Sequence, residues 1–137
     1  MKFMILVKAT QDSEAGRMPS ESLFKAMADY HEALMKAGIL VDASGLQRTQ
    51  NGWRIRYDGN QRTFVDGPFT ETKELVAGYT VIDVRSRAEA IEWTKRFPNP
   101  AVDGGAGEIE VRPYFELEDF GPSEQVARFR NMVAGSA

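Results

Sequence analysis

The sequence predicts a small α+β domain in which two amphipathic helices cover one face of a mostly antiparallel sheet. Two observations lead to this fold class. Segments rich in β-branched and aromatic residues recur along the chain, and two stretches between them place apolar residues at spacings of three and four. The 137 residues fit a single domain. Because the chain has no cysteine, its core must form without disulfides or thiolate-bound metals.

The first part of the chain predicts a strand, a loop and a helix. Residues 3–9 form a nearly continuous apolar run, which is typical of a central strand buried on both faces. The polar segment 10–19 predicts a loop. Ser20 or Ser22 can then cap a helix that ends at Gly38. The predicted buried stripe of this helix consists of Leu23, Phe24, Met27, Tyr30, His31, Leu34 and Met35.

The middle of the chain predicts a second strand and a β-hairpin. A strand is expected within residues 39–49, and the Asn-Gly pair at 51–52 is a strong signal for a hairpin turn. The alternating large and basic residues of 53–57 are typical of a half-exposed strand. An Asp-Gly turn at 58–59 leads to a returning strand over 62–65.

The last part predicts a strand, a helix and a strand. Residues 76–84 are rich in Val, Ile, Tyr and Thr. Ser86 and Glu89 form a capping box at the start of a second helix, which Pro98 ends, and residues 109–111 belong to the final strand. With the hairpin treated as an insertion, the order of elements is the βαββαβ pattern of a ferredoxin-like fold.

This pattern predicts one domain over residues 1–120 and a tail over 121–137. The tail contains a weak amphipathic segment, which is either a short docking helix or a frayed end. A sheet with both helices on one face leaves its other face bare. A second copy of the chain is the economical cover for that face, so the architecture predicts a homodimer.

Composition weighs against several kinds of partner. Lys and Arg total 17 against 20 Asp and Glu, a net charge of −3, whereas a nucleic-acid-binding protein needs a basic face. No apolar stretch approaches the roughly 20 residues that span a bilayer. The apolar N-terminal run is too short for a signal peptide and is followed by no cleavage site. Together with the absence of cysteine, this predicts a cytoplasmic protein with neither nucleic-acid nor membrane partners.

The single histidine, His31, is the first candidate catalytic residue. It lies four residues after Met27, so it points toward the buried stripe of the first helix. Imidazole titrates near neutral pH and can act as a general base or acid. The alternative is a half-buried histidine whose nitrogens only hold the packing together, and the sequence leaves both interpretations open.

Asp66 is the second candidate catalytic residue, because it precedes a stiff Gly-Pro-Phe turn. A carboxylate held there in a pocket could orient a histidine through a ring N–H. The alternative is an ordinary turn-forming Asp that accepts bonds from nearby backbone N–H groups. The spacing does not establish contact with His31. The candidate substrate-binding residues are Gly67, Pro68, Phe69 and Lys73.

No other motif carries chemistry. One histidine and scattered carboxylates make no recognisable metal set, so neither a metal nor a cofactor is predicted. The Gly-rich segment 104–107 is followed by neither Lys-Ser/Thr nor a helix, which excludes a phosphate loop. Ser44 lacks the Gly-x-Ser-x-Gly elbow of a nucleophile.

The stretch Asp-Gly-Pro-Phe-Thr-Glu-Thr-Lys-Glu at 66–74 resembles the signature of the YCII-related proteins, which are named for their DGPF motif. The resemblance extends from Met1 to about Arg112. It is carried by further matching segments at 30–32, 79–84, 88–93 and 108–113.

This resemblance implies a dimeric α/β barrel of ferredoxin-like subunits, with a cleft in which His31 and Asp66 form the catalytic pair. One function class is therefore a cofactor-independent enzyme of the isomerase or lyase type. In it, His31 would abstract a proton from a small, cyclic or aromatic substrate, and backbone N–H groups of the turn would stabilise the oxyanion. The second class is a non-catalytic dimeric module that binds a small ligand or a protein, since some members of the family are associated with sigma factors. A bare structural dimer is the third.

Overall fold

The computed structural model of the protein describes residues 1–135, and it confirms the α+β class. The last two residues of the predicted tail, 136–137, lie outside this described part. The helices are α1 (Gln11–Glu14), α2 (Glu21–Lys36), α3 (Arg87–Lys95) and α4 (Glu124–Gly135). The strands are β1 (Lys2–Lys8), β2 (Leu40–Gly45), β3 (Trp53–Asp58), β4 (Gln61–Asp66), β5 (Val76–Asp83) and β6 (Ile109–Pro113). Three short 3₁₀ turns are η1 (Thr49–Asn51), η2 (Thr72–Glu74) and η3 (Leu117–Phe120).

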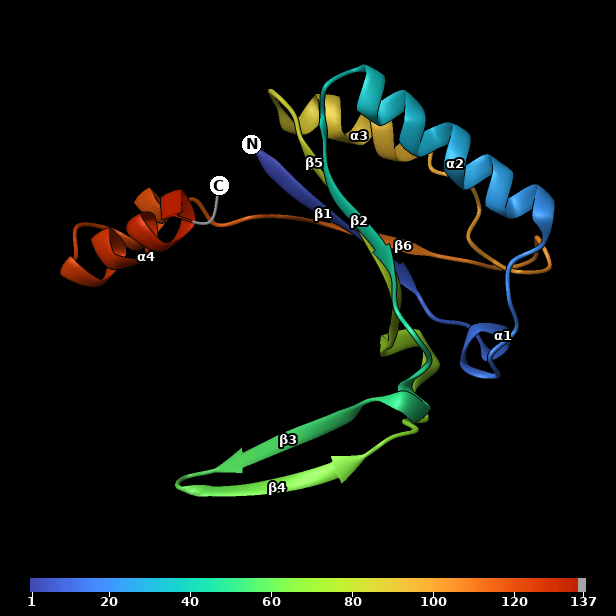
Figure 1. The fold of residues 1–137 in the computed structure, drawn as a ribbon, viewed down its shortest axis with the longest axis horizontal. Helices are drawn as coiled ribbons and strands as arrows, with labels where there is room; N and C mark the ends of the chain where they lie inside the picture. Colours follow the sequence, from blue (N-terminus) through green and yellow to red (C-terminus); the bar gives the residue numbers. More distant parts are fainter. Residues whose placement is uncertain (136–137) are drawn as a thin grey trace.

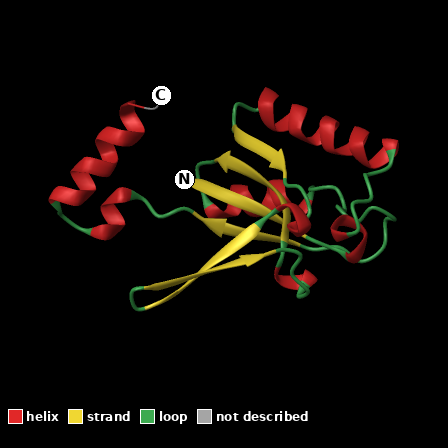
Figure 2. Cartoon of the chain, turned by 60° about the horizontal axis from the view of Figure 1, so that its bottom comes forward, coloured by secondary structure: helices red, strands yellow, loops and turns green. Residues whose placement is uncertain are grey.

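Four strands form the main sheet in the order β2-β5-β1-β6, and every neighbouring pair is antiparallel. Strands β3 and β4 pair only with each other and form a separate two-stranded hairpin. Figure 1 shows α2 and α3 on one side of the sheet, while the hairpin and α4 extend toward the other side. The turned view in Figure 2 also shows α4 standing away from the sheet. The sheet therefore has one face covered by helices and one that they leave open.

The hydrophobic core lies between the main sheet and helices α2 and α3. On β1, Phe3 and Ile5 are buried and face the helices, whereas the alternate residues Met4 and Leu6 face away, as the two-residue period of a strand requires. The buried core cluster consists of Phe3, Ile5, Tyr30, Leu34, Ile39, Ile82, Val84 and Ala90.

Helix α2 begins at the first of the two predicted caps, since the Ser20 hydroxyl accepts the N–H of Leu23. Its buried stripe is narrower than predicted. Phe24 and Met35 are 62% and 61% exposed, because each lies about 100° around the helix from a more buried neighbour. The Tyr30 hydroxyl donates to the carbonyl of Trp93 (2.7 Å) and so links α2 to α3. Burial raises the pKa of Tyr30 to about 12.

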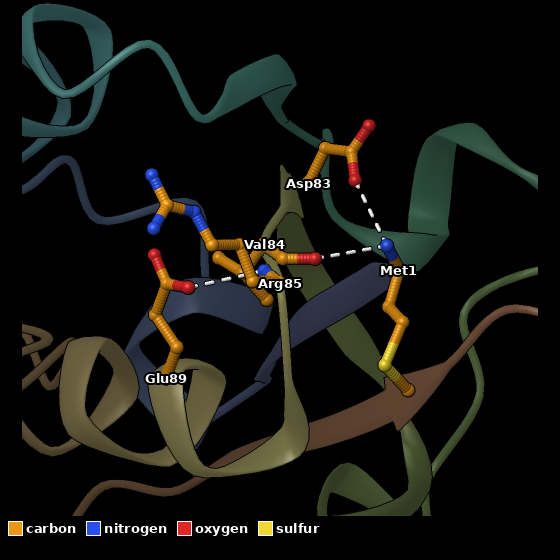
Figure 3. A network of polar contacts seen from close by, with 5 residues as sticks. All are labelled: Met1, Asp83, Val84, Arg85 and Glu89. Atoms are coloured by element: carbon orange, nitrogen blue, oxygen red, sulfur yellow. Dashed lines mark hydrogen bonds and ion pairs between the residues drawn. The ribbon is translucent and has the colours of Figure 1, made fainter.

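Figure 3 shows how the end of β5 is joined to β1 and to α3. The amino group of Met1 donates to the carbonyl of Val84 (2.8 Å) and to the carboxylate of Asp83 (3.1 Å). The Glu89 carboxylate accepts the N–H of Arg85 (3.0 Å). The backbone N–H of Glu89 donates to the hydroxyl of Ser86 (3.1 Å). Ser86 thereby caps one of the free N–H groups in the first turn of α3, and Glu89 fastens the connection between β5 and the helix.

Two local predictions were wrong. The predicted loop over 10–19 contains α1, because Thr10 and Ser13 cap each other's backbone N–H groups. The Asn-Gly pair at 51–52 does not turn a hairpin. Strand β2 pairs with β5, the chain then leaves the main sheet through η1, and the only turn of the described hairpin lies between Asp58 and Gln61. No helix in residues 1–135 has the length and apolar character needed to cross a membrane.

Candidate functional site

His31 is half-buried between α2 and the sheet, and both of its ring nitrogens are engaged. Nδ1 lies 2.7 Å from the carbonyl oxygen of Met27, and Nε2 lies 2.8 Å from the hydroxyl oxygen of Thr80 on β5. A carbonyl can only accept, so Nδ1 carries the hydrogen. In the neutral ring, Nε2 therefore accepts the hydroxyl proton of Thr80. The imidazole thus ties the middle of α2 to the centre of the sheet.

Two aromatic rings and a buried hydroxyl surround the His31 ring. The rings of Tyr30 and Phe97 meet it edge-on, with centroids 5.7 and 6.1 Å away. Thr80 is only 2% exposed. The lone pair of Nε2, which a general base would use, is directed at a buried hydroxyl. A substrate proton could reach it only after the Thr80 hydroxyl had rotated away.

Asp66 belongs to the other sheet. It is the last residue of β4, it is exposed, and it stands opposite Trp53 in the hairpin. Within residues 1–135, no hydrogen bond or ion pair joins its carboxylate to His31. The structure therefore places the two candidate catalytic residues in different layers of one chain without contact, and their pairing remains a prediction.

The turn that follows Asp66 is docked on η1. The N–H of Gly67 donates to the carbonyl of Gly52 (3.0 Å), and the N–H of Phe69 donates to the hydroxyl of Thr49 (3.0 Å). A Cβ atom at Gly67 would lie 1.7 Å from the carbonyl oxygen of Thr49, so only glycine fits there. Both N–H groups are already used, and neither is free to stabilise a substrate oxyanion in this arrangement.

A carboxylate from α1 holds this arrangement in place. Glu14 accepts both the N–H (3.1 Å) and the hydroxyl of Thr49, and both bonds are partly buried. Thr49 thus connects α1 to the turn. Sequence reasoning missed Glu14, Thr49 and Thr80. Thr10 and Ser13, three residues apart, could have predicted the start of α1. No short-range pattern predicts the contacts of Glu14 with Thr49 or of His31 with Thr80, because these residues are far apart in the sequence.

Of the remaining candidate substrate-binding residues, Phe69 packs against β3, while Pro68 and Lys73 are exposed. The guanidinium of Arg54 lies over the Phe69 ring, 3.7 Å from its centroid, which fastens the turn to β3. Pro68 is exposed beside it, and the exposed Lys73 lies in η2. In residues 1–135, no group of three or more side chains of the metal-binding types gathers at one place.

The uncovered face of the main sheet, which we call the open face, has an apolar floor. Met4, Val81 and Asp42 are register partners across β1, β5 and β2, and Leu6, Tyr79 and Ser44 form the next row. Register partners point to the same side of an antiparallel sheet, and these alternate with the buried core positions. The open face therefore contains Met4, Leu6, Asp42, Ser44 and Tyr79, the buried Val81 between them, and Arg112 and Glu110 of β6, which are the register partners of Met4 and Leu6.

One polar pair stands on this floor. The hydroxyl of Tyr79 donates to the carboxylate of Asp42 (2.8 Å), and this bond raises the pKa of Tyr79. Beside it, Glu110 lies between the cations of Lys8 and Arg112, 3.6 Å from each. The open face therefore combines apolar side chains with a hydroxyl, carboxylates and cations.

The hairpin also exposes an apolar face. Register pairs place Trp53, Ile55, Tyr57 and Phe64 on one side, together with Arg62 at the tip and Asp66 at the base. Trp53 and Phe64 stack with their centroids 6.3 Å apart, yet they remain 61% and 59% exposed. We call this surface the hairpin face. An apolar surface of this kind is typical of an interface.

Fold and site together define a small α+β protein with a closed, helix-covered sheet face, an open sheet face and a hairpin anchored by a Gly-Pro-Phe turn. The chain belongs to the YCII-related domain family, whose model matches residues 1–118. It is also 29% identical over 93 residues to an uncharacterised protein of Rhizobium meliloti (strain 1021), covering 68% of this chain and 73% of that protein. The family assignment made from the DGPF motif is confirmed.

Substituting Gly67 by alanine tests the docking of the turn. The new Cβ would overlap the Thr49 carbonyl, so we expect Gly67→Ala to lower the free energy of unfolding by about 1–3 kcal/mol. Gly45→Ala is the matched control, because a Cβ there meets nothing within 4 Å; its effect should stay within about 0.5 kcal/mol. Urea unfolding measures both variants. Equal stability of the two variants would contradict the docking.

Proposed function

We propose that this protein is a homodimeric small-ligand-binding module in which the open faces of two copies enclose the ligand site. One observation carries the proposal: the hydrogen-bonded Tyr79–Asp42 pair stands on the apolar floor of a sheet face that no helix covers. Ligand sites typically combine an apolar lining with a few well-placed polar groups. A small cyclic or aromatic compound with a hydroxyl or carboxyl group matches this surface.

The strand arrangement supports the dimeric part of the proposal. The order β2-β5-β1-β6, with antiparallel neighbours and both α2 and α3 on one side, is the arrangement of a ferredoxin-like subunit once the hairpin is set aside. Two such subunits that face each other through their open faces would form an α/β barrel. The hairpin and α4 extend beyond the open face, where a second copy would stand (Figure 1).

Acid–base catalysis by His31 and Asp66 is the second candidate function. The carbonyl of Met27 favours it, because it holds the proton on Nδ1 and leaves Nε2 with the lone pair that a base needs. Proton abstraction in an isomerase or lyase reaction would then require rotation of the Thr80 hydroxyl and approach of an Asp66 carboxylate. The buried Thr80 and the separation of the two residues weigh against it, and for this reason we place ligand binding first.

The dimer can be tested at the floor of the open face. We expect the wild-type chain to sediment as a dimer and Leu6→Asp to sediment as a folded monomer, since the aspartate would be buried without a partner. Met35→Asp on the exposed side of α2 is the control and should remain dimeric, because Met35 is 61% exposed. A monomeric wild-type chain, or a dimeric Leu6→Asp, would sink this part of the proposal.

Ligand binding can be tested with a panel of small cyclic and aromatic carboxylic acids and phenols, followed by protein NMR shifts. We expect a subset of these probes to shift resonances of the open face. Tyr79→Phe should weaken their binding about three- to tenfold, as the loss of one hydrogen bond implies. Tyr57→Phe on the hairpin is the matched control and should bind as the wild type does. The proposed ligand site would be refuted if no probe shifted resonances of the open face, or if Tyr79→Phe bound the probes with unchanged affinity.

The two candidate functions make opposite predictions for the ¹⁵N resonances of the His31 ring, which is the only imidazole of the chain. We expect Thr80→Val to move the Nε2 resonance, because it removes the hydrogen-bond partner, and Asp66→Asn to leave both nitrogens unchanged. A shift of the ring nitrogens in Asp66→Asn would show that the two residues are coupled and would favour the acid–base enzyme.

A further inference from the structure

We propose that the C-terminal arm of each copy, residues 114–135, packs against the hairpin face of its partner. The inference rests on the homodimer of the proposed function and adds to it the segment that the two copies exchange. The arm consists of η3 and α4 with the residues around them. Its helix lies beyond residue 118, where the match to the family model ends.

The arm is organised internally but extends away from the body of its own chain. Phe115 and Phe120 pack together with ring centroids 4.9 Å apart, and Arg130 on α4 lies 3.3 Å from Glu118 on η3. In Figures 1 and 2, α4 stands apart from both the main sheet and the hairpin. A short helix is marginally stable in water by itself, so a surface that packs against α4 is needed.

The arm also exposes more large apolar side chains than a free segment should. Phe115 is 74% exposed, Phe120 and Phe129 are each 58% exposed, and Met132 is 57% exposed. On α4, the half-buried Val126 and the exposed Phe129 are three residues apart and share a side of the helix. Contiguous apolar surface of this kind marks a protein–protein contact.

The arm and the hairpin match in two respects: both expose apolar side chains, and the two segments carry opposite net charges. The hairpin face exposes four large apolar side chains together with Arg62 and Asp66. The other side of the hairpin carries Arg54, Arg56 and Asp58, so residues 53–66 as a whole hold three arginines against two aspartates. Residues 114–135 carry four carboxylates against two arginines, a net charge of −2 against +1 for the hairpin. Opposite net charges favour pairing of the two segments and disfavour contact between two arms.

A two-fold dimer explains why both surfaces are exposed in one chain. In such a dimer, the contact of the first arm with the second hairpin is repeated by the second arm and the first hairpin. Both arms and both hairpin faces are then covered at once. The exchange also places the hairpin, and with it Asp66 at its base, against residues of the other copy.

The absence of cysteine allows a direct test by disulfide trapping in the full-length protein. Chains carrying Ile55→Cys on the hairpin face are mixed with chains carrying Phe129→Cys on α4, subunits are allowed to exchange, and the mixture is oxidised. We expect the mixed disulfide, identified by mass, to form at least about tenfold faster than in a control that pairs Ile55→Cys with Glu32→Cys on the outer side of α2. A rate equal to the control would overturn the proposal.

A second measurement separates failure of the arm contact from failure of the dimer. Phe129→Asp should raise the dimer dissociation constant at least about tenfold, because it places a charge in the centre of the contact. Phe24→Asp is the matched control, since Phe24 is 62% exposed on α2, and it should leave the constant unchanged. A dimer that Phe129→Asp does not weaken refutes the arm contact alone. A wild-type monomer refutes both the arm contact and the dimeric function.

Discussion

The contact between Glu14 and Thr49 is the constraint on which the placement of the hairpin depends. Glu14 accepts two hydrogen bonds from Thr49, and Thr49 in turn holds the turn after Asp66 through Phe69 and limits position 67 to glycine. Hydrogen bonds to a charged group contribute about 1.5–3 kcal/mol each, more than neutral ones. The bond from the Arg48 guanidinium to the Ala15 carbonyl (3.2 Å) reinforces the same junction between α1 and η1. Together these contacts orient the hairpin face and Asp66 at its base.

The same contact gives the DGPF stretch a structural role. Gly67 is required by the approach of the Thr49 carbonyl, and Phe69 is required as the surface on which Arg54 lies. A motif can therefore be a marker of the family because it anchors a hairpin. Asp66 has no described contact of this kind: it is exposed at the base of the hairpin face.

The parts of the fold that the sequence predicted correctly are those determined by short-range patterns. Helix α2 was readable from its apolar spacing and from Ser20, and β5 from its β-branched residues. The Asn-Gly pair at 51–52 was misread because the partner of β2 is β5, more than thirty residues along the chain, and no local signal carries that pairing. The hydrogen bond between Thr80 and His31 could not be predicted for the same reason, since the two residues are 49 positions apart. The alternative of a packing histidine, left open by the sequence, matches the contacts observed.

The two faces of the main sheet therefore differ in what they can offer to another molecule. On the helix side, His31, Thr80 and Tyr30 satisfy one another or nearby carbonyls, and in the described part of the chain no buried side-chain polar atom lacks a partner. A ligand entering that layer would have to break bonds that already exist, at a cost of about 1–3 kcal/mol for each group left unpaired. On the open face, the Asp42 carboxylate accepts the Tyr79 hydroxyl and the N–H of Ala43, and Asp42 is exposed to solvent. Recognition at the open face needs no such rearrangement, and covering it with a second copy would strengthen every polar contact made there by excluding water.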